Sequence, residues 1–88
     1  MKKNDLVLRE YVSKLSDENI DFLQTRFEQN RAGDLSDCLD FMSRNQDMDR
    51  LLCSASSVDE FYVVIDHIVE SVRKEITKRE KDKKLISQ

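Results

Sequence analysis

The stretch SVDEFYVVIDHIVESVRKEI, residues 57–76, decides the fold of this chain. Ser57 with Glu60 three residues later is the pattern of a capping box, in which side-chain oxygens bind the free amides of a helix's first turn. Apolar residues then recur within an arc of about 160° at 100° per residue. An arc this wide predicts a long helix that contacts several neighbours or a second copy. Its apolar members are Val58, Phe61, Tyr62, Val64, Ile65, Ile68, Val69, Val72 and Ile76.

Shorter apolar stripes upstream predict the rest of the bundle. Ser16 is expected to cap the second helix. Gly33 is expected to close that helix in the left-handed conformation, and Asp34 to cap the next one. Beyond it, residues 34–55 form either one helix or two helices that break near Asn45. The predicted spans are 5–15, 17–30, 34–55 with or without this break, and the long helix from Ser57.

The composition excludes a β-rich fold. The 88 residues include one Gly and no Pro, and the chain contains none of the dipeptides that close β-hairpins. We therefore predict an all-α fold, a compact bundle of four to five helices with a long C-terminal helix. Residues 1–77 are expected to form a single helical domain. Residues 78–88 are a charged tail, either a solvated helical extension or, as we expect, frayed.

The charges are sorted into blocks along the chain. The net charge is +2 over residues 1–15, −9 over 16–72 and +4 over 73–88, which gives the total of −3. Separated patches of opposite charge steer encounters between proteins. This pattern favours association, with a second copy or with another partner.

The N-terminal residues do not resemble a signal peptide, because Lys2 and Lys3 precede Asn-Asp rather than an apolar run. The longest uninterrupted apolar run, Phe61–Ile65, is far shorter than the ~20 residues that span a membrane. We expect a cytoplasmic protein without membrane contact. Cys38 and Cys53 are then expected to be reduced and buried.

The sequence gives no support for an enzyme, a metal site or a cofactor. The single histidine, His67, is expected to face solvent, so a nucleophile would lack a histidine base. Cys38, Cys53 and His67 lack the paired spacing of zinc ligands. Asn45-x-Asp47-x-Asp49 resembles the start of a calcium loop, but Arg50 replaces its glycine and Ser56 its final glutamate. One glycine is too few for a phosphate-binding loop.

Protein association has the best support from individual residues. Phe22, Phe41 and Val63 fall outside their helix stripes, either because the bundle buries two sides of a helix or because they form an exposed interface. We assign partner binding to these three with Tyr62, since tyrosine is enriched at interface hot spots. The predicted function is a small non-enzymatic adaptor or regulator that forms a homodimer. The predicted dimer interface comprises Phe61, Ile65, Ile68, Val72 and Ile76.

Nucleic-acid binding is the alternative function. The helix after Gly33 carries Asp34, Asp37 and Asp40, whose charges oppose its use as a DNA recognition helix. The basic C-terminal run remains a candidate for binding phosphates without sequence preference, although it contains no aromatic residue for base stacking. The phosphate-binding residues of this alternative are Lys78, Arg79, Lys83 and Lys84.

Overall fold

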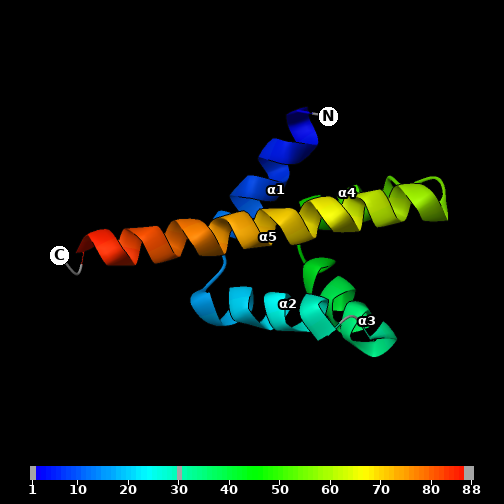
Figure 1. The fold of residues 1–88 in the computed structure, drawn as a ribbon. Helices are drawn as coiled ribbons and strands as arrows, with labels where there is room; N and C mark the ends of the chain where they lie inside the picture. Colours follow the sequence, from blue (N-terminus) through cyan, green and yellow to red (C-terminus); the bar gives the residue numbers. More distant parts are fainter. Residues whose placement is uncertain (1, 30, 87–88) are drawn as a thin grey trace.

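The stretch around residues 57–76 forms the longest helix of the protein, α5 (Val58–Ile86). It lies across four shorter helices in the computed structural model, which describes residues 2–29 and 31–86 and the side chains of 6–29, 31 and 33–83 (Figure 1). These residues contain no strand, so the predicted all-α fold is confirmed, with five helices. The shorter helices are α1 (Lys2–Lys14), α2 (Asp17–Gln29), α3 (Ala32–Met42) and α4 (Gln46–Cys53).

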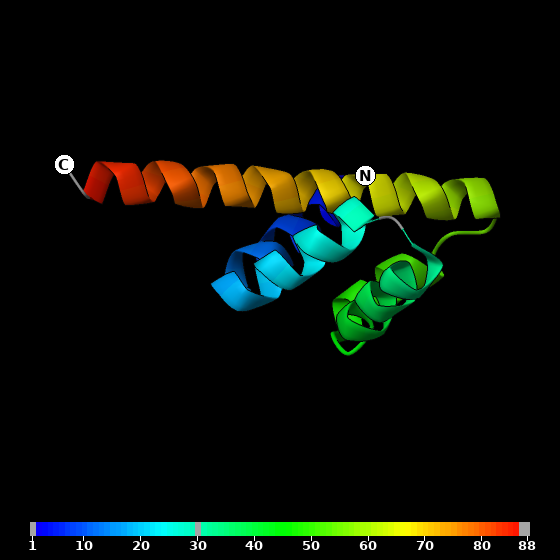
Figure 2. The ribbon, with the colours of Figure 1, turned by 60° about the horizontal axis from the view of Figure 1, so that its bottom comes forward.

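The four short helices lie on one side of α5. Helices α1, α2 and α4 contact it directly, while α3 packs mainly on α2, and α4 also packs on α1. In the turned view of Figure 2, α5 runs as a rod along one edge, with the other helices beneath it. The opposite side of α5 is therefore uncovered by any other helix of the described chain (Figures 1 and 2).

The core follows the predicted stripes. Burying these apolar side chains is the main driving force for the fold, because each removes apolar surface from water. Val58 and Tyr62 are exceptions to the predicted arc of α5, since they are 69% and 54% exposed. The buried side chains of the core are Leu8, Val12, Ile20, Leu23, Cys38, Met42, Met48, Leu51, Ile65, Ile68 and Val72.

The predicted cap at Ser16 and the predicted helix break near Asn45 are both confirmed by hydrogen bonds. The Ser16 hydroxyl accepts from the Asn19 amide at 3.2 Å, which opens α2. Asn45 Oδ1 accepts from the Met48 amide at 3.1 Å, which opens α4. Residues 34–55 therefore form two helices, because Asn45 adopts an extended conformation between them.

The capping box of α5 is half confirmed. The Ser57 hydroxyl accepts from the Glu60 amide at 3.2 Å. The Glu60 carboxylate, however, accepts from the Ser56 amide and the Ser56 hydroxyl, both at 2.9 Å, rather than from Ser57. These two hydrogen bonds lower the pKa of Glu60.

The predicted boundary between the second and third helices is wrong. Gly33 lies within the first turn of α3, and the cap position is held by Arg31 with φ −99° and ψ 150°. Asp34 is not the cap either. It lies inside the first turn, where its buried carboxylate binds the side chains of Arg31 and Arg26. The contact with Arg26 joins α2 to α3, and the contact with Arg31 lies within the first turn of α3.

The C-terminal tail is helical to Ile86. Residues 78–86 therefore continue α5, which is the first of the two alternatives, and are not frayed as we expected. Residues 87–88 lie outside the described part of the chain. Arg79 explains how the extension is attached, because its side chain reaches from α5 to the end of α1.

Candidate functional site

The candidate functional site is the uncovered side of α5, which we call the outward face. Its side chains are all exposed because they lie opposite the buried Ile68 and Val72 on a helix of 3.6 residues per turn. It comprises Asp59, Glu60, Tyr62, Val63, Asp66, His67, Glu70, Arg73, Lys74, Thr77, Lys78, Glu80 and Lys81.

The outward face changes sign along its length. Its first half carries four carboxylates, and its second half carries four bases with the single acid Glu80. Glu70 and Lys74 meet where the halves join, with 3.5 Å between Oε1 and Nζ. Both side chains are largely exposed, so this ion pair contributes little to stability. Their charges remain accessible to a partner.

An apolar patch lies at the acidic end. Val58, Tyr62 and Val63 are 69%, 54% and 54% exposed and occupy the first two turns of α5. The Tyr62 ring packs edge-on against Phe61, with ring centroids 6.0 Å apart and an interplanar angle of 71°. Asp59 lies between these residues in the sequence. We call Val58, Tyr62 and Val63 the apolar patch.

The structure divides the four predicted partner-binding residues into two pairs. Tyr62 and Val63 lie in the apolar patch. Phe22 and Phe41 are half-buried against the core where α2 meets α3, with ring centroids 5.7 Å apart. Arg26 Cζ lies 5.1 Å from the centroid of the Phe22 ring. These two rings fill the space between helices, which corresponds to the structural alternative that the sequence left open.

The predicted dimer interface coincides largely with the core. Ile65, Ile68 and Val72 are 7%, 1% and 1% exposed within the single chain. Phe61 and Ile76 are partly buried against the same core. Helices α1, α2 and α4 pack against this side of α5 and cover the three buried residues. In this fold these residues are therefore unavailable to a second copy.

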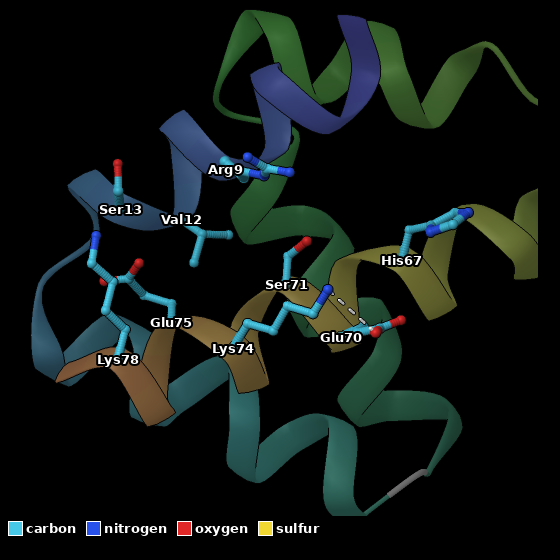
Figure 3. A pocket seen from close by; sticks show the side chains of 9 residues that line it. All are labelled: Arg9, Val12, Ser13, His67, Glu70, Ser71, Lys74, Glu75 and Lys78. Carbon is cyan, nitrogen blue, oxygen red and sulfur yellow. Dashed lines mark ion pairs between the residues drawn. The ribbon is translucent and has the colours of Figure 1, made fainter. Parts of the chain in front are cut away.

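A groove of about 520 Å³ runs along one edge of the outward face, between α1 and α5 (Figure 3). Figure 3 shows Arg9, Lys74 and Lys78 around it together with His67 and two carboxylates, and Lys74 is paired to Glu70. His67 is exposed, as predicted. The groove residues are Arg9, Val12 and Ser13 from α1, and His67, Glu70, Ser71, Lys74, Glu75 and Lys78 from α5.

Arg79 joins α5 to the start of α2 and to the end of α1. This structural role was not predicted from the sequence. Its Nε donates to Glu75 Oε2 at 2.8 Å and its Nη1 to Asp17 Oδ1 at 2.8 Å. Its Nη2 donates to the Leu15 carbonyl at 2.7 Å, and more weakly to two other carbonyls at the end of α1. The hydrogen bond that Arg79 donates to Glu75 raises the pKa of Arg79, although burial opposes it. The sequence feature that could have indicated this role is the charged pair Glu75 and Arg79, four residues apart on the apolar side of α5.

These contacts weaken the predicted phosphate-binding set. Arg79 is committed to two carboxylates and to the end of α1, so it is not available to a phosphate. Lys83 Nζ lies 4.0 Å from Asp17 Oδ2. Lys78 is exposed beside the groove, and the side chain of Lys84 lies outside the described residues.

The second ionic cluster is structural and joins α2 to α3. Arg31 Nε and Arg26 Nη1 each donate to the Asp34 carboxylate at 2.8 Å, and Arg26 also reaches Asp37 at 3.1 Å. The hydrogen bonds from Arg31 and Arg26 lower the pKa of Asp34, against the effect of its burial. Both oxygens of the buried Asp34 carboxylate therefore accept a hydrogen bond from an arginine.

The cysteines differ in environment. Cys38 is buried, as predicted, and burial raises its pKa to about 11. Cys53 is exposed at the end of α4, so the prediction that it is buried is wrong. The reason is that Met48, Leu51 and Leu52 provide the inward side of that short helix. Among the described side chains, no three potential metal ligands lie close enough to hold an ion.

Comparisons with protein-family models, curated proteins and solved structures give no significant match. Over the described residues, even α5 lacks the length of apolar sequence that would cross a membrane.

Proposed function

We propose that this chain is a non-enzymatic protein-interaction module, an adaptor or regulator, and that the outward face of α5 is its binding surface. The observation that carries the proposal is the apolar patch, of which Tyr62 and Val63, each 54% exposed, lie on the outward face and Val58, 69% exposed, lies next to it. Clusters of exposed apolar side chains beside charged residues are typical of protein interfaces. Tyr62 is the expected anchor, because tyrosine is enriched at interface hot spots.

Helix α5 is held in place by the rest of the fold, which suits its outward face to binding a partner. Its inward side is held by Ile65, Ile68 and Val72, and its far part is held by Arg79. Since the backbone of the outward face is ordered before a partner arrives, binding costs little conformational entropy. The neighbouring carboxylates Asp59 and Glu60 favour a partner surface that is both apolar and basic.

A capture experiment with matched variants tests the proposal. The immobilised chain is exposed to lysate of the native cells, and retained proteins are quantified by mass spectrometry. The double variant Tyr62→Ser/Val63→Ser is expected to lose the retained partner while its circular dichroism and melting temperature stay unchanged. Leu6→Ser is the control, because Leu6 is 57% exposed on α1, outside the patch. Equal retention by the patch variant and the wild type would refute the proposal.

Nucleic-acid binding is the second candidate, supported by the exposed bases Arg73, Lys74, Lys78 and Lys81 on one half of the outward face. Binding to labelled DNA should then weaken steeply between about 50 and 200 mM salt. It should also weaken in Lys78→Gln/Lys81→Gln, which removes two of these bases and leaves Arg79 in place. Undiminished binding by that variant would exclude the tail as the site.

A further inference from the structure

We infer that the partner of the outward face is a second copy of this chain, whose α5 packs against it in the antiparallel direction. This inference rests on the proposed function and names its partner. The outward face is acidic and apolar in its first half and basic in its second half. Such a face is complementary to itself when one copy is reversed, so the required partner surface already exists on the same helix.

The shape of the molecule allows this contact. The outward face extends from Asp59 to Lys81, roughly 33 Å at 1.5 Å per residue. In Figure 2 the four other helices of the described chain lie together on one side of α5. The outward face is therefore open to a second copy, which would approach it from the side away from these helices. Antiparallel pairing is isologous and closes at two copies.

A seam of alternating three- and four-residue steps runs along the centre of the outward face, through Val63, Asp66, Glu70, Arg73, Thr77 and Glu80. Placing the two-fold axis between Glu70 and Arg73 sets each Glu70 opposite the Arg73 of the other copy. The same register brings Glu60 close to Lys81 of the second copy. It also covers the exposed ring of Tyr62 with the basic half, whose long side chains have apolar stems.

Parallel pairing lacks this complementarity. In a parallel pair each seam residue lies opposite itself, so Asp66 would face Asp66 and Arg73 would face Arg73. Facing like charges repel, whereas the reversed arrangement sets Glu70 against Arg73 on both sides of the axis and places the acidic half beside the basic half. The charge order therefore selects one direction. The seam is mostly polar, so the dimer is held largely by charge and is salt-sensitive.

Charge-reversal variants test the use of this face, with mass measured by sedimentation equilibrium at several protein concentrations. Asp66→Lys/Glu70→Lys places bases on both sides of the two-fold axis, and Arg73→Glu/Lys78→Glu places acids on both sides of it. Each variant alone is expected to be monomeric, and their equimolar mixture is expected to restore a dimer. For the wild type, raising salt from 50 to 500 mM is expected to increase the dissociation constant about tenfold or more, because it shortens the Debye length to a few Å.

The control reverses an exposed pair away from the face. Asp40 and Arg44 lie on α3 and beside it, with side chains 80% and 76% exposed. Asp40→Lys/Arg44→Glu is expected to dimerise like the wild type. Loss of the dimer in this control, or a dimer in either single-sign variant, would overturn the assignment to α5.

Disulfide trapping tests the direction. Two single-site variants, Val63→Cys and Glu80→Cys, are made with Cys53→Ser to remove the exposed native thiol. Antiparallel pairing predicts a mixed disulfide between positions 63 and 80. It predicts none between two copies of Val63→Cys, since those positions are roughly 25 Å apart along the helices. A 63–63 disulfide would overturn the antiparallel arrangement.

The outcomes separate this inference from the proposed function. A wild-type chain that stays monomeric at all concentrations overturns the second copy as partner. The proposed function is then judged by capture alone, through the loss of a different protein in Tyr62→Ser/Val63→Ser.

Discussion

Arg79→Met is expected to destabilise the protein more than any other exchange of a charged residue on α5. The guanidinium connects α5 with Asp17 at the start of α2 and with the Leu15 carbonyl beyond α1. It also pairs with Glu75, whose side chain is only 14% exposed. Methionine retains most of the apolar stem, so the variant removes the polar contacts and leaves the packing largely unchanged.

The magnitude follows from the exposure of each contact. The Glu75 pair, with both side chains mostly buried, contributes about 1.5 kcal/mol, and the hydrogen bond to the Leu15 carbonyl about 1 kcal/mol. The Asp17 pair contributes about 0.5 kcal/mol or less, because Asp17 is 70% exposed. The expected loss in free energy of unfolding is about 2–3 kcal/mol. For a domain of this size, it lowers the melting temperature by roughly 10–20 °C.

Urea unfolding followed by circular dichroism measures this loss, under conditions where the transition is two-state. Lys83→Gln is the matched control, since Lys83 approaches Asp17 only at 4.0 Å and is 73% exposed. The control is expected to change stability by less than about 0.5 kcal/mol. Glu75→Gln should cost less in the Arg79→Met background than in the wild type, because the charge it removes is then unpaired. An Arg79→Met variant as stable as Lys83→Gln would refute this account of how α5 is attached.

Three further predictions concern the core and the α2–α3 junction. Phe22→Ala and Phe41→Ala are each expected to lower the free energy of unfolding by about 1–3 kcal/mol, less than the loss of a fully buried phenylalanine. A double-mutant cycle should give a coupling of about 0.5–1.5 kcal/mol between the two rings. Fully additive losses in urea unfolding would contradict the ring contact. Asp34 has a lowered pKa, so its contribution is present above the unfolded value of 3.8 and is lost as the pH falls through its folded value. Asp34→Asn should therefore flatten the loss of stability below about pH 4 in acid titrations, and an unchanged profile would exclude Asp34 as a source. Ellman's reagent at pH 8 should label Cys53 rapidly and Cys38 only on unfolding, since Cys38 is buried with a pKa of about 11; rapid labelling of two thiols would contradict this burial.

The order of helices was predictable because it depends on local signals. Apolar periodicity and capping residues act within one or two turns, so they place α2, α4 and α5 without knowledge of their neighbours. Gly33 shows the limit of local signals. Its neighbours suggest a left-handed helix end, but Asp34 binds an arginine eight residues away on another helix, and this contact draws residues 32–34 into α3.

The division of α5 into two faces depended on the tertiary structure. From the sequence, the wide apolar arc allowed either a core or a dimer interface, because both bury the same residues. Packing of α1, α2 and α4 assigns Ile65, Ile68 and Val72 to the core and leaves Val58, Tyr62 and Val63 exposed.

The sequence by itself determined an all-α chain with its charges sorted into blocks, since both properties are read along one dimension. Only the tertiary structure decided which charges are free. Arg79 is bound at the end of α1, whereas Lys78, the residue before it, and Arg73, six residues before it, remain on the outward face. The physical reason is that burial and ion pairing depend on which helix lies opposite a side chain, and that neighbour is fixed by packing over the whole fold.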